Sequence, residues 1–547
     1  MRLSPFRRLL TPLIATCCVA ITSSCSRQSS NVTTGNATQT LHLAISAEPR
    51  DIDPHLVSAF TDFQVVLALF EGLTAIDETS SRPVPSCAES WETSADGLTW
   101  TFHLRPDLKW SDGEPLTAQT FRDSFARALA PTIASEYAYV LYPIKNAARF
   151  NAGDLPDFVA VGVKAVDATT LTIELERPTP TLPSLLTLPV SWPVPVHVLK
   201  RHGGFIDRNN RWTRSENIVS NGPFRLTAWT PNQRLVAERN PHYYGNAETK
   251  LNGLAFYPYE NAASQEAAFR AGQLHLTSEM PLSKIATYRA EQPDLLRIDP
   301  FLLTGFIRFN LTQPPFDDVR VRRALSLAIN RNALAEHVLT GGELPAHSLT
   351  PPDTAGYRSV TTVHYDPAQA RQLLADAGYP QGQGFPVTEI ITAARQLNQQ
   401  LLEAIQQMWR RELGIEVQLA LKEQRVWLDD ETQLHYQLSN ARWIGDYVDP
   451  YTFLELFYSF SGNNNTGWKN PTYDRLLQAA SVESDETRRL TLYQEAETVL
   501  LDDAPITPLY HGTQAYLIRP EVQGWPPTLL GLHRYQYVSL RSENAGK

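Results

Sequence analysis

VTEIITAARQLNQQLLEAIQQMWRRELGIEVQL, residues 387–419, carries a strand pattern, then a helix pattern, then a second strand pattern. Its first six residues are rich in β-branched side chains, which favour a strand. Leu401, Ile405 and Met408 then recur at helical spacing, and Gly414 is typical of a helix end. The residues after Gly414 alternate between apolar and polar. A strand, a helix and a strand within about 35 residues predict a βαβ unit with a parallel strand pair.

Helix signals also flank this unit. Asp366 and Pro367 predict a helix start, as the N-cap and the first helical residue, and Gly378 predicts its end. Residues 484–501 have the apolar spacing of another amphipathic helix. These patterns indicate a large α/β protein.

An α+β pattern precedes the α/β region. Residues 99–104 and 171–175 alternate between apolar and polar, as half-buried strands do. Between them, residues 117–129 place large apolar side chains four apart, on one face of a predicted helix. We therefore expect a separate α+β unit over residues 72–195.

The composition is that of a large globular protein. The 547 residues suffice for three or four packing units at roughly 150 residues each. A hydrophobic content of 42% and a charged content of 19% exclude a disordered or fibrous chain. The formal charge of −10 argues against nucleic acid as a partner.

The first residues have the pattern of an export signal. Arg2, Arg7 and Arg8 form a positive region, and residues 9–21 follow as a mostly apolar run. This run is shorter than the roughly 20 apolar residues that a membrane-spanning helix needs. Residues 1–24 are therefore predicted to be a cleaved signal.

Cys25 follows small residues, which resembles the lipid attachment site of bacterial lipoproteins. Thr22 stands where that motif prefers Leu, so simple cleavage near Ser24 and a free product are the alternative. Residues 25–40 are polar and are predicted to form a tether behind the lipid anchor.

Sequence motifs of catalysis are absent. The chain contains no G-x-S-x-G, H-E-x-x-H, P-loop or C-x-x-C motif, and its 13 histidines are scattered. Carboxylate pairs such as Asp502–Asp503 are adjacent in sequence, and neighbouring side chains point apart in a helix or strand. Cys87 is predicted to be a buried small hydrophobe. We expect a binding protein without metal or cofactor.

An ordered series of strings from residue 41 to about residue 540 resembles the solute-binding proteins of bacterial oligopeptide ABC importers, family 5 of the extracellular solute-binding proteins. The strings include EPRDIDPH (48–55), DGLTWTFHLRPDLKWSDGEPLTAQTF (96–121), NGPFRL (221–226), PPFDDVRVRRALSLAINR (314–331), GDYVDP (445–450) and NNNTGWKNPTYDRLL (463–477).

The resemblance implies a two-lobe periplasmic-binding-protein fold of type II, with an extra α+β domain and two crossover strands as the hinge. The chain would cross between the lobes near Leu302 and Thr513. The implied domains are lobe I at 41–71, 196–302 and 514–540, the extra domain at 72–195, and lobe II at 303–513.

The resemblance also implies a function, which is to capture an oligopeptide by lobe closure and to deliver it to an inner-membrane ABC permease. Such a receptor is not an enzyme, and we expect a monomer in the periplasm or cell envelope, anchored by lipid. One alternative is a peptide sensor or chaperone without transport. Another is the same fold with a modified peptide or other solute, such as a sugar or metal complex, and a hydrolytic enzyme is the third.

In the family an aspartate binds the ligand's ammonium group, and Asp446 stands at its position. The alternative is that Asp446 only caps a turn. Tyr137 matches a phenol that also reaches the amine, with plain packing as its alternative. The implied peptide-backbone and cleft contacts are Asn440, Ala441, Arg442, Trp443, Ile444, Ser58 and Tyr510.

Several positions depart from the family pattern. Cations that meet the peptide carboxylate in relatives are replaced by Leu339, Asn398, Glu431 and Asn440. Ser58 replaces an acidic residue, Gly512 replaces an aromatic one, and Leu303 and Ile444 stand where some relatives have a disulfide. Three explanations are open: the ligand is longer and protrudes, Arg442 substitutes as the cation, or the ligand is a modified peptide.

Overall fold

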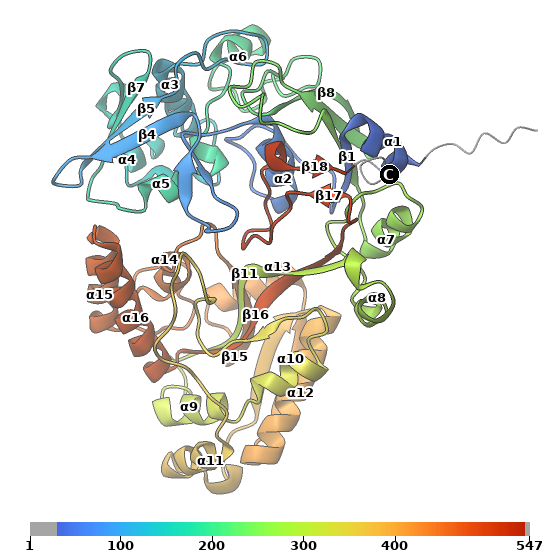
Figure 1. Cartoon of the computed structure of the whole chain (residues 1–547). Coiled ribbons are helices and arrows are strands. Elements are labelled where there is room, and N and C mark those ends of the chain that lie inside the picture. The colour runs from blue at the N-terminus through green and yellow to red at the C-terminus, as the bar shows by residue number, and fades with distance from the viewer. Residues whose placement is uncertain (1–29, 542–547) are drawn as a thin grey trace, which may run out of the picture.

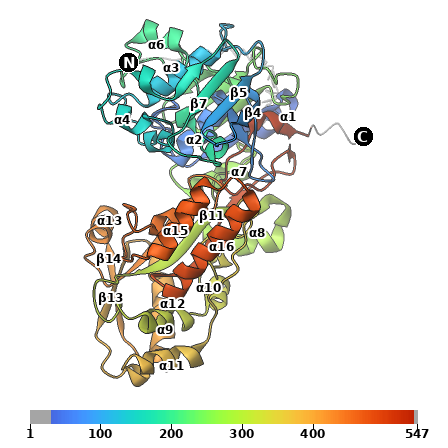
Figure 2. The same cartoon turned by 90° about the vertical axis from the view of Figure 1, so that its left-hand side faces the viewer.

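The computed structural model describes residues 30–541, which form two lobes stacked along the long axis of the molecule (Figures 1 and 2). The two-lobe α/β fold that the sequence predicts is confirmed. The predicted signal and Cys25 lie outside the described residues. Within residues 30–541, no helix is both long and apolar enough to cross a membrane.

One lobe is built on a six-stranded sheet in the order β12-β16-β11-β15-β13-β14. The predicted βαβ unit is confirmed, because β13 and β14 pair in parallel around α12. The bounds are β11 (Leu296–Phe309), β12 (Leu344–Pro345), β13 (Thr388–Ala393), α12 (Gln396–Leu413), β14 (Val417–Lys422), β15 (Leu438–Ile444) and β16 (Ile506–Leu517).

Helices cover this sheet. The predicted helix start at Asp366 is confirmed, since its side chain accepts hydrogen bonds from the N–H groups of Ala368 and Gln369. The helix predicted at 484–501 is α16. The bounds are α9 (Val319–Leu327), α10 (Arg331–His337), α11 (Pro367–Asp376), α13 (Gln424–Thr432), α14 (Tyr451–Leu454), α15 (Pro471–Val482) and α16 (Glu486–Asp503).

The other lobe contains a four-stranded sheet in the order β1-β10-β9-β8, in which β1 and β10 are parallel. The C-terminal strands β17 and β18 form a separate hairpin-like pair beside it. The bounds are β1 (Thr40–Ile45), α2 (Phe60–Leu69), α6 (Val196–His202), β8 (Phe224–Thr230), β9 (Arg234–Arg239), β10 (Gly253–Pro258), α7 (Ala262–Arg270), α8 (Ile285–Glu291), β17 (Val522–Gln523) and β18 (Ser539–Leu540).

The same lobe carries the predicted α+β unit, with a sheet in the order β4-β5-β7-β6. β5 and β7 are the two predicted alternating strands, and α3 is the helix predicted between them. Cys87 is buried and free, as predicted. The bounds are β2 (Thr74–Ile76), β3 (Pro83–Pro85), β4 (Ala88–Thr93), β5 (Thr99–Leu104), α3 (Ala118–Ala128), α4 (Ala147–Asn151), β6 (Val163–Ala165), β7 (Thr170–Glu174) and α5 (Leu182–Leu185).

The predicted tether at 25–40 is wrong from residue 31 onward, because α1 (Asn31–Thr38) is a docked helix and β1 follows it. The buried Asn36 is hydrogen-bonded at 3.1 Å to the ring of His275. Gly35 lies so close to the backbone of Thr40 that a Cβ would collide with it. This helix is held by tertiary contacts of polar and small residues. Its sequence therefore has no apolar stripe from which a helix could be predicted.

The two long strands β11 and β16 connect the lobes, and their pairing is interrupted between Pro300 and Thr304, opposite Gly512. Within this break, the N–H of Leu302 donates to the carbonyl of Leu529 at 2.7 Å. The carbonyl of Leu302 accepts from the N–H of Gly445 at 2.8 Å. The interruption lies at the crossover that the sequence predicts.

Candidate binding site

Asp446 lies two residues beyond the end of β15, where the two lobes meet. Its carboxylate accepts long hydrogen bonds from the phenols of Tyr137 and Tyr139, both at 3.4 Å. The backbone N–H of Asp446 donates to the hydroxyl of Thr452 at 3.2 Å. The structure therefore brings together Asp446 and Tyr137, as the sequence predicts.

Tyr139 is a site residue that the sequence analysis missed. Its ring stacks on that of Tyr137, with the centroids 5.8 Å apart and the planes at 26°. The signal was available, because Tyr139 stands two residues after Tyr137 in the string ASEYAY.

Asp446 carries its charge without a cation. It forms no ion pair with any of residues 30–541. Burial raises the pKa of Asp446, and the hydrogen bonds from Tyr137 and Tyr139 oppose that rise. A half-buried carboxylate in this state is destabilised, and an ammonium group would supply the missing charge.

Two further carboxylates lie close to Asp446. Burial, reinforced by the charges of Asp446 and Asp449, raises the pKa of Glu455 to about 7. Burial is also the main cause that raises the pKa of Asp449 to about 6. The region around Asp446 therefore favours the arrival of positive charge.

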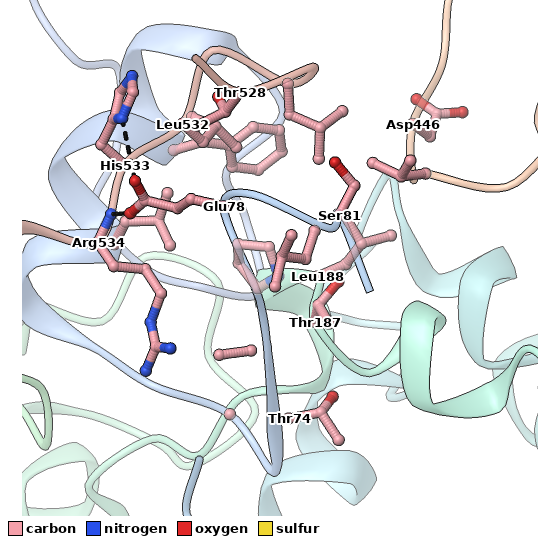
Figure 3. Close-up of a pocket in the computed structure, with 18 of the residues that line it drawn as sticks. Thr74, Glu78, Ser81, Thr187, Leu188, Asp446, Thr528, Leu532, His533 and Arg534 are labelled. Carbon is pink, nitrogen blue, oxygen red and sulfur yellow. Dashed lines mark hydrogen bonds and ion pairs between the residues drawn. The ribbon is translucent and has the colours of Figure 1, made fainter. Parts of the chain in front are cut away.

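A cavity of about 290 Å³ adjoins Asp446 (Figure 3). It also contains Ser58, Tyr137 and Ile444, which the sequence analysis placed in the cleft. Its walls are otherwise largely apolar and come from distant segments, among them Phe60, Phe63, Phe70, Trp192, Leu529 and Leu532. This apolar wall was not predictable from the sequence, because single apolar residues on distant segments form no local pattern.

The other carboxylates of this cavity are satisfied inside the protein. Glu71 accepts hydrogen bonds from Tyr243 at 2.7 Å and from Ser86 and Tyr244 at 2.9 Å. Glu78 contacts His533 at 3.3 Å and the backbone N–H of Arg534 (Figure 3). Asp446 is thus the carboxylate of the cavity with unused binding capacity.

One edge of β15 is open beside this cavity. β11 pairs with β15 along its whole length, whereas β13 pairs only with Leu438 and Ser439. The N–H of Gly445 points to β11, so alternation turns the backbone groups of Ile444, Arg442 and Asn440 toward the open edge. An extended peptide can add to such an edge as a further strand.

The two remaining residues of the predicted segment lie differently. Ala441 is buried, and Trp443 packs partly into the core beneath the sheet. Their backbone groups face β11 by the same alternation. The segment 440–444 therefore offers every second residue to a ligand.

A second, smaller cavity of about 40 Å³ lies along the open edge of β15. Its polar lining includes Arg395, Asn398, Asn440, Arg442 and Tyr510. Tyr510 was predicted to lie in the cleft, whereas Arg395 was missed. The amides of Asn398 and Asn440 both donate to the hydroxyl of Thr392, at 3.0 and 3.2 Å.

The departures from the family pattern have structural explanations. Leu339 is part of the buried core. Glu431 is buried too, and it forms an ion pair with Arg308 at 3.0 Å and accepts a hydrogen bond from Ser439 at 2.7 Å. A Cβ on Gly512 would lie 2.9 Å from the Cβ of Leu303, so an aromatic side chain cannot fit there without a shift.

Positions 303 and 444, where the resemblance implies a disulfide in some relatives, are direct partners across β11 and β15. In this protein the two positions hold Leu303 and Ile444. The one described cysteine is Cys87, which is free, and burial raises the pKa of its thiol well above the ordinary value. Within residues 30–541, no group of three or more His, Cys, Asp or Glu side chains could hold a metal ion.

Two lobes joined by paired strands, with a cavity and an unpaired carboxylate between them, define a ligand-binding protein of the two-domain class. The family model described as "Bacterial extracellular solute-binding proteins, family 5 Middle" matches residues 82–465. The chain belongs to this family.

Curated relatives match nearly the whole chain. A "Periplasmic oligopeptide-binding protein OppA" of Salmonella typhimurium is 36% identical over 497 residues, which cover 89% of this chain and 90% of that protein. A "Probable deoxycholate-binding periplasmic protein YgiS" of Escherichia coli is 37% identical over 488 residues, which cover 88% of this chain and 89% of that protein.

Solved structures match over the same extent. An unliganded open form of MppA, a periplasmic murein tripeptide binding protein, has a TM-score of 0.83 at 32% identity and covers 92% of this chain and 97% of that chain. Haemophilus influenzae OppA in complex with RPPGFSPFR has a TM-score of 0.70 at 29% identity and covers 92% of this chain and 99% of that chain.

Proposed function

We propose that this protein is a periplasmic receptor that captures oligopeptides between its lobes and delivers them to the permease of an ABC importer. The main support is Asp446, a half-buried carboxylate at the end of an open strand edge, with no cationic partner among residues 30–541. Membership of family 5 and the oligopeptide-binding relatives support the same function. The site binds its ligand and cleaves no bond in it.

The ligand's ammonium group would bind Asp446 in a charge-assisted hydrogen bond. Tyr137 and Tyr139 hold that carboxylate in place and leave room for the ammonium, since their hydrogen bonds are long, at 3.4 Å. The peptide backbone would pair with Arg442 and Ile444 at the open edge of β15. These contacts use features common to all peptides, so they give affinity without sequence choice.

The apolar cavity beside Asp446 would accept the side chains nearest the ligand's amino end. A cavity of about 290 Å³ with largely apolar walls favours apolar side chains there. Sequence preference would therefore come from the cavity, and the anchoring would come from Asp446.

Closure of the lobes would complete the site. We propose the domain limits that the resemblance implies: 41–71, 196–302 and 514–540 for lobe I, 72–195 for the extra domain and 303–513 for lobe II. The pairing break of β11 and β16 supports a hinge at this crossover. Of two MppA structures at the same 32% identity, the unliganded open form has the higher TM-score, 0.83 against 0.73, which supports an open state of this structure.

The variant Asp446→Asn tests the anchor. It should weaken binding of a free-amine tripeptide by about 2–5 kcal/mol, as for truncation of one partner of a buried charged pair. N-acetylation of the peptide should weaken binding to the parent protein by a similar amount, and calorimetry measures both. Asp154→Asn is the control, because Asp154 is exposed and lines neither cavity. Equal affinities for free and acetylated peptide would refute the assignment.

A second candidate ligand is a rigid, largely apolar solute. The apolar walls of the larger cavity favour it, and one relative is described as probably deoxycholate-binding. Competition calorimetry with deoxycholate and a tripeptide separates the two, since a bile-acid receptor should bind deoxycholate more tightly and should not respond to Asp446→Asn.

We further propose that a lipid on Cys25 anchors the mature protein to the membrane. The small residues before Cys25 support this, and a mass measurement of the membrane-extracted protein tests it. Uptake of labelled peptide in cells that lack the protein distinguishes a transport receptor from a sensor or chaperone, since only deletion of a transport receptor should reduce uptake.

A further inference from the structure

We infer that the ion pair between Arg82 and Glu486 is a clasp between the two lobes, which limits how far they separate when no ligand is bound. The inference rests on the proposed closure of the lobes and adds to it a contact outside the ligand site. It gives a role in capture to two residues that line neither cavity.

The two side chains of the clasp meet through two parallel contacts. Nη2 of Arg82 lies 2.7 Å from Oε1 of Glu486, and Nη1 lies 3.2 Å from Oε2. Two N–H donors on two carboxylate oxygens fix the direction of the contact as well as its length. A terminal nitrogen of Arg82 also lies 3.9 Å from the place that a Cβ on Gly356 would occupy, so the arginine reaches a second segment of the opposite lobe.

The clasp is the one ion pair that joins the lobes within residues 30–541. Arg82 directly precedes β3, in the lobe that carries the α+β unit. Glu486 is the first residue of α16, in the lobe of the six-stranded sheet. The other ion pairs of the described residues each lie within one lobe.

Side-chain hydrogen bonds join the described parts of the lobes at one further place. These are the long bonds from Tyr137 and Tyr139 to Asp446. A ligand's ammonium group would bind the same carboxylate and compete with the phenols. The contact between Arg82 and Glu486 is therefore the one that a bound ligand leaves intact.

Each partner of the clasp is held firmly by its own lobe. The N–H of Asp77 donates to the carbonyl of Arg82 at 2.9 Å, and the carboxylate of Asp77 accepts from the N–H of Ser80 at 2.7 Å, which closes the turn. Glu486 begins a helix of 18 residues, and the N-cap Asp485 accepts a hydrogen bond from the helix backbone. Since both backbones are fixed, the ion pair constrains the lobes and not a loose loop.

The clasp lies beside the larger cavity. The turn that carries Arg82 also lines this cavity, through Glu78 and Ser81, and Asp446 lines it from the other lobe (Figure 3). Closure on a ligand brings these two walls together and so keeps Arg82 close to Glu486. Wider opening moves the walls apart and breaks the ion pair.

The expected effect on capture is small and has a definite sign. The side chains of Arg82 and Glu486 are 53% and 43% exposed, and an exposed ion pair shifts an equilibrium by up to about fivefold. A free protein whose lobes are held closer together loses less freedom on closure, so the clasp should strengthen binding. Salt should weaken the clasp by screening.

The test measures the distance between the lobes in the ligand-free protein at low salt. Double electron–electron resonance between spin labels on Val159→Cys and Phe460→Cys reports this distance, in a protein that also carries Cys25→Ser. Adding Arg82→Met should extend the distance distribution toward longer values. In calorimetry, Arg82→Met should bind a free-amine tripeptide more weakly, by up to about fivefold, and salt should weaken the parent more than the variant.

A double-mutant cycle isolates the ion pair from other effects of each side chain. Arg82→Met, Glu486→Met and the double variant should give the same distances and affinities, because each removes the same contact. Arg358→Met is the matched control, since it breaks an exposed ion pair with Asp353, at 2.9 Å, that lies within one lobe. Unchanged thermal unfolding shows that the variants fold.

Identical distance distributions of the parent and of Arg82→Met would overturn the clasp and leave the peptide receptor intact. A shift of the variant to shorter distances, or tighter peptide binding by it, would overturn the clasp as well, because the ion pair would then hold the lobes apart. Failure of the parent to bind any free-amine peptide would instead overturn the proposed function, and the distances in the ligand-free protein would still decide the clasp.

Discussion

Asp446 differs from Asp53, Glu431 and Glu71 in how its charge is balanced. Asp53 pairs with Arg127, and Glu431 pairs with Arg308. Glu71 accepts hydrogen bonds from three hydroxyl groups, whereas Asp446 accepts only two long ones. The free protein is thus destabilised at one residue, and a ligand's ammonium group can recover that free energy.

This imbalance predicts that peptide binding releases protons below pH 7. Glu455, with a pKa raised to about 7, is partly protonated there, and the pKa of Asp446 is raised as well. The peptide's ammonium lowers the pKa of both carboxyls, so protons leave and affinity rises as the pH increases from about 5 to about 7, where the amine stays charged.

Calorimetry in buffers of different ionisation enthalpy measures the released protons. Glu455→Gln removes one titrating group and should reduce the release, while Asp154→Asn should leave it unchanged. A binding enthalpy independent of the buffer would contradict the prediction.

At the residue scale, two polar residues of the candidate site were predicted and its apolar walls were not. Asp446 and Tyr137 were assigned from the resemblance to the family, and the structure places them in contact. The walls consist of common apolar residues such as Phe60 and Leu529, which become neighbours only through the fold. Arg395 was missed for the same reason, because an arginine at a helix start has no local pattern that marks it as part of a cleft.

At the element scale, β11 and β16 are each continuous strands whose mutual pairing is broken where they cross between the lobes. There the backbone N–H and C=O of Leu302 form hydrogen bonds with Leu529 and Gly445, and not with β16. Opposite it, Gly512 packs against Leu303 with no space for a side chain. The crossover is therefore tightly packed although its ladder is interrupted.

This packing predicts that Gly512→Ala lowers the free energy of unfolding by about 1–3 kcal/mol, the usual cost of overpacking. The new methyl group would lie 2.9 Å from the Cβ of Leu303, which cannot rotate away as the end of a side chain can. Urea unfolding measures the change. Gly462→Ala is the matched control, since no atom lies within 4 Å of its new methyl group. Equal stability of the two variants would contradict this account.

Elements with a strong local pattern were predictable, and elements held by tertiary contacts were not. The unit of β13, α12 and β14 combines both periodicities with a glycine stop, and it folds as predicted. α1 has no apolar stripe, and it is held by contacts such as that of Asn36 with His275. Its sequence was therefore indistinguishable from a polar tether.

At the scale of the whole molecule, the site draws on parts that are far apart in sequence. Tyr137 comes from the α+β unit, Asp446 from the loop after β15, and Leu529 from the C-terminal segment. A ligand that contacts all of them favours the arrangement in which they converge. Its differential affinity for that arrangement sets how far it shifts the equilibrium between open and closed states.

Saturating peptide should therefore shorten the distance between the lobes. Spin labels on Val159→Cys and Phe460→Cys report it, because both side chains are largely exposed and lie in different lobes. The buried Cys87 should not react, and Cys25→Ser removes the other cysteine of residues 25–547. Double electron–electron resonance should show a shorter distance between the two labels with a free-amine tripeptide and no change with its N-acetylated form.

A label pair within one lobe separates closure from other effects of the ligand. Val387→Cys and Val426→Cys are both exposed and both lie beside the six-stranded sheet, so their distance should stay constant. If the interlobe distance stays constant while calorimetry shows binding, the ligand binds to the open form and the hinge has no part in capture. If the distance shortens and Asp446→Asn abolishes the shortening at equal peptide concentration, then one carboxylate couples recognition of an amino end to movement of the whole molecule.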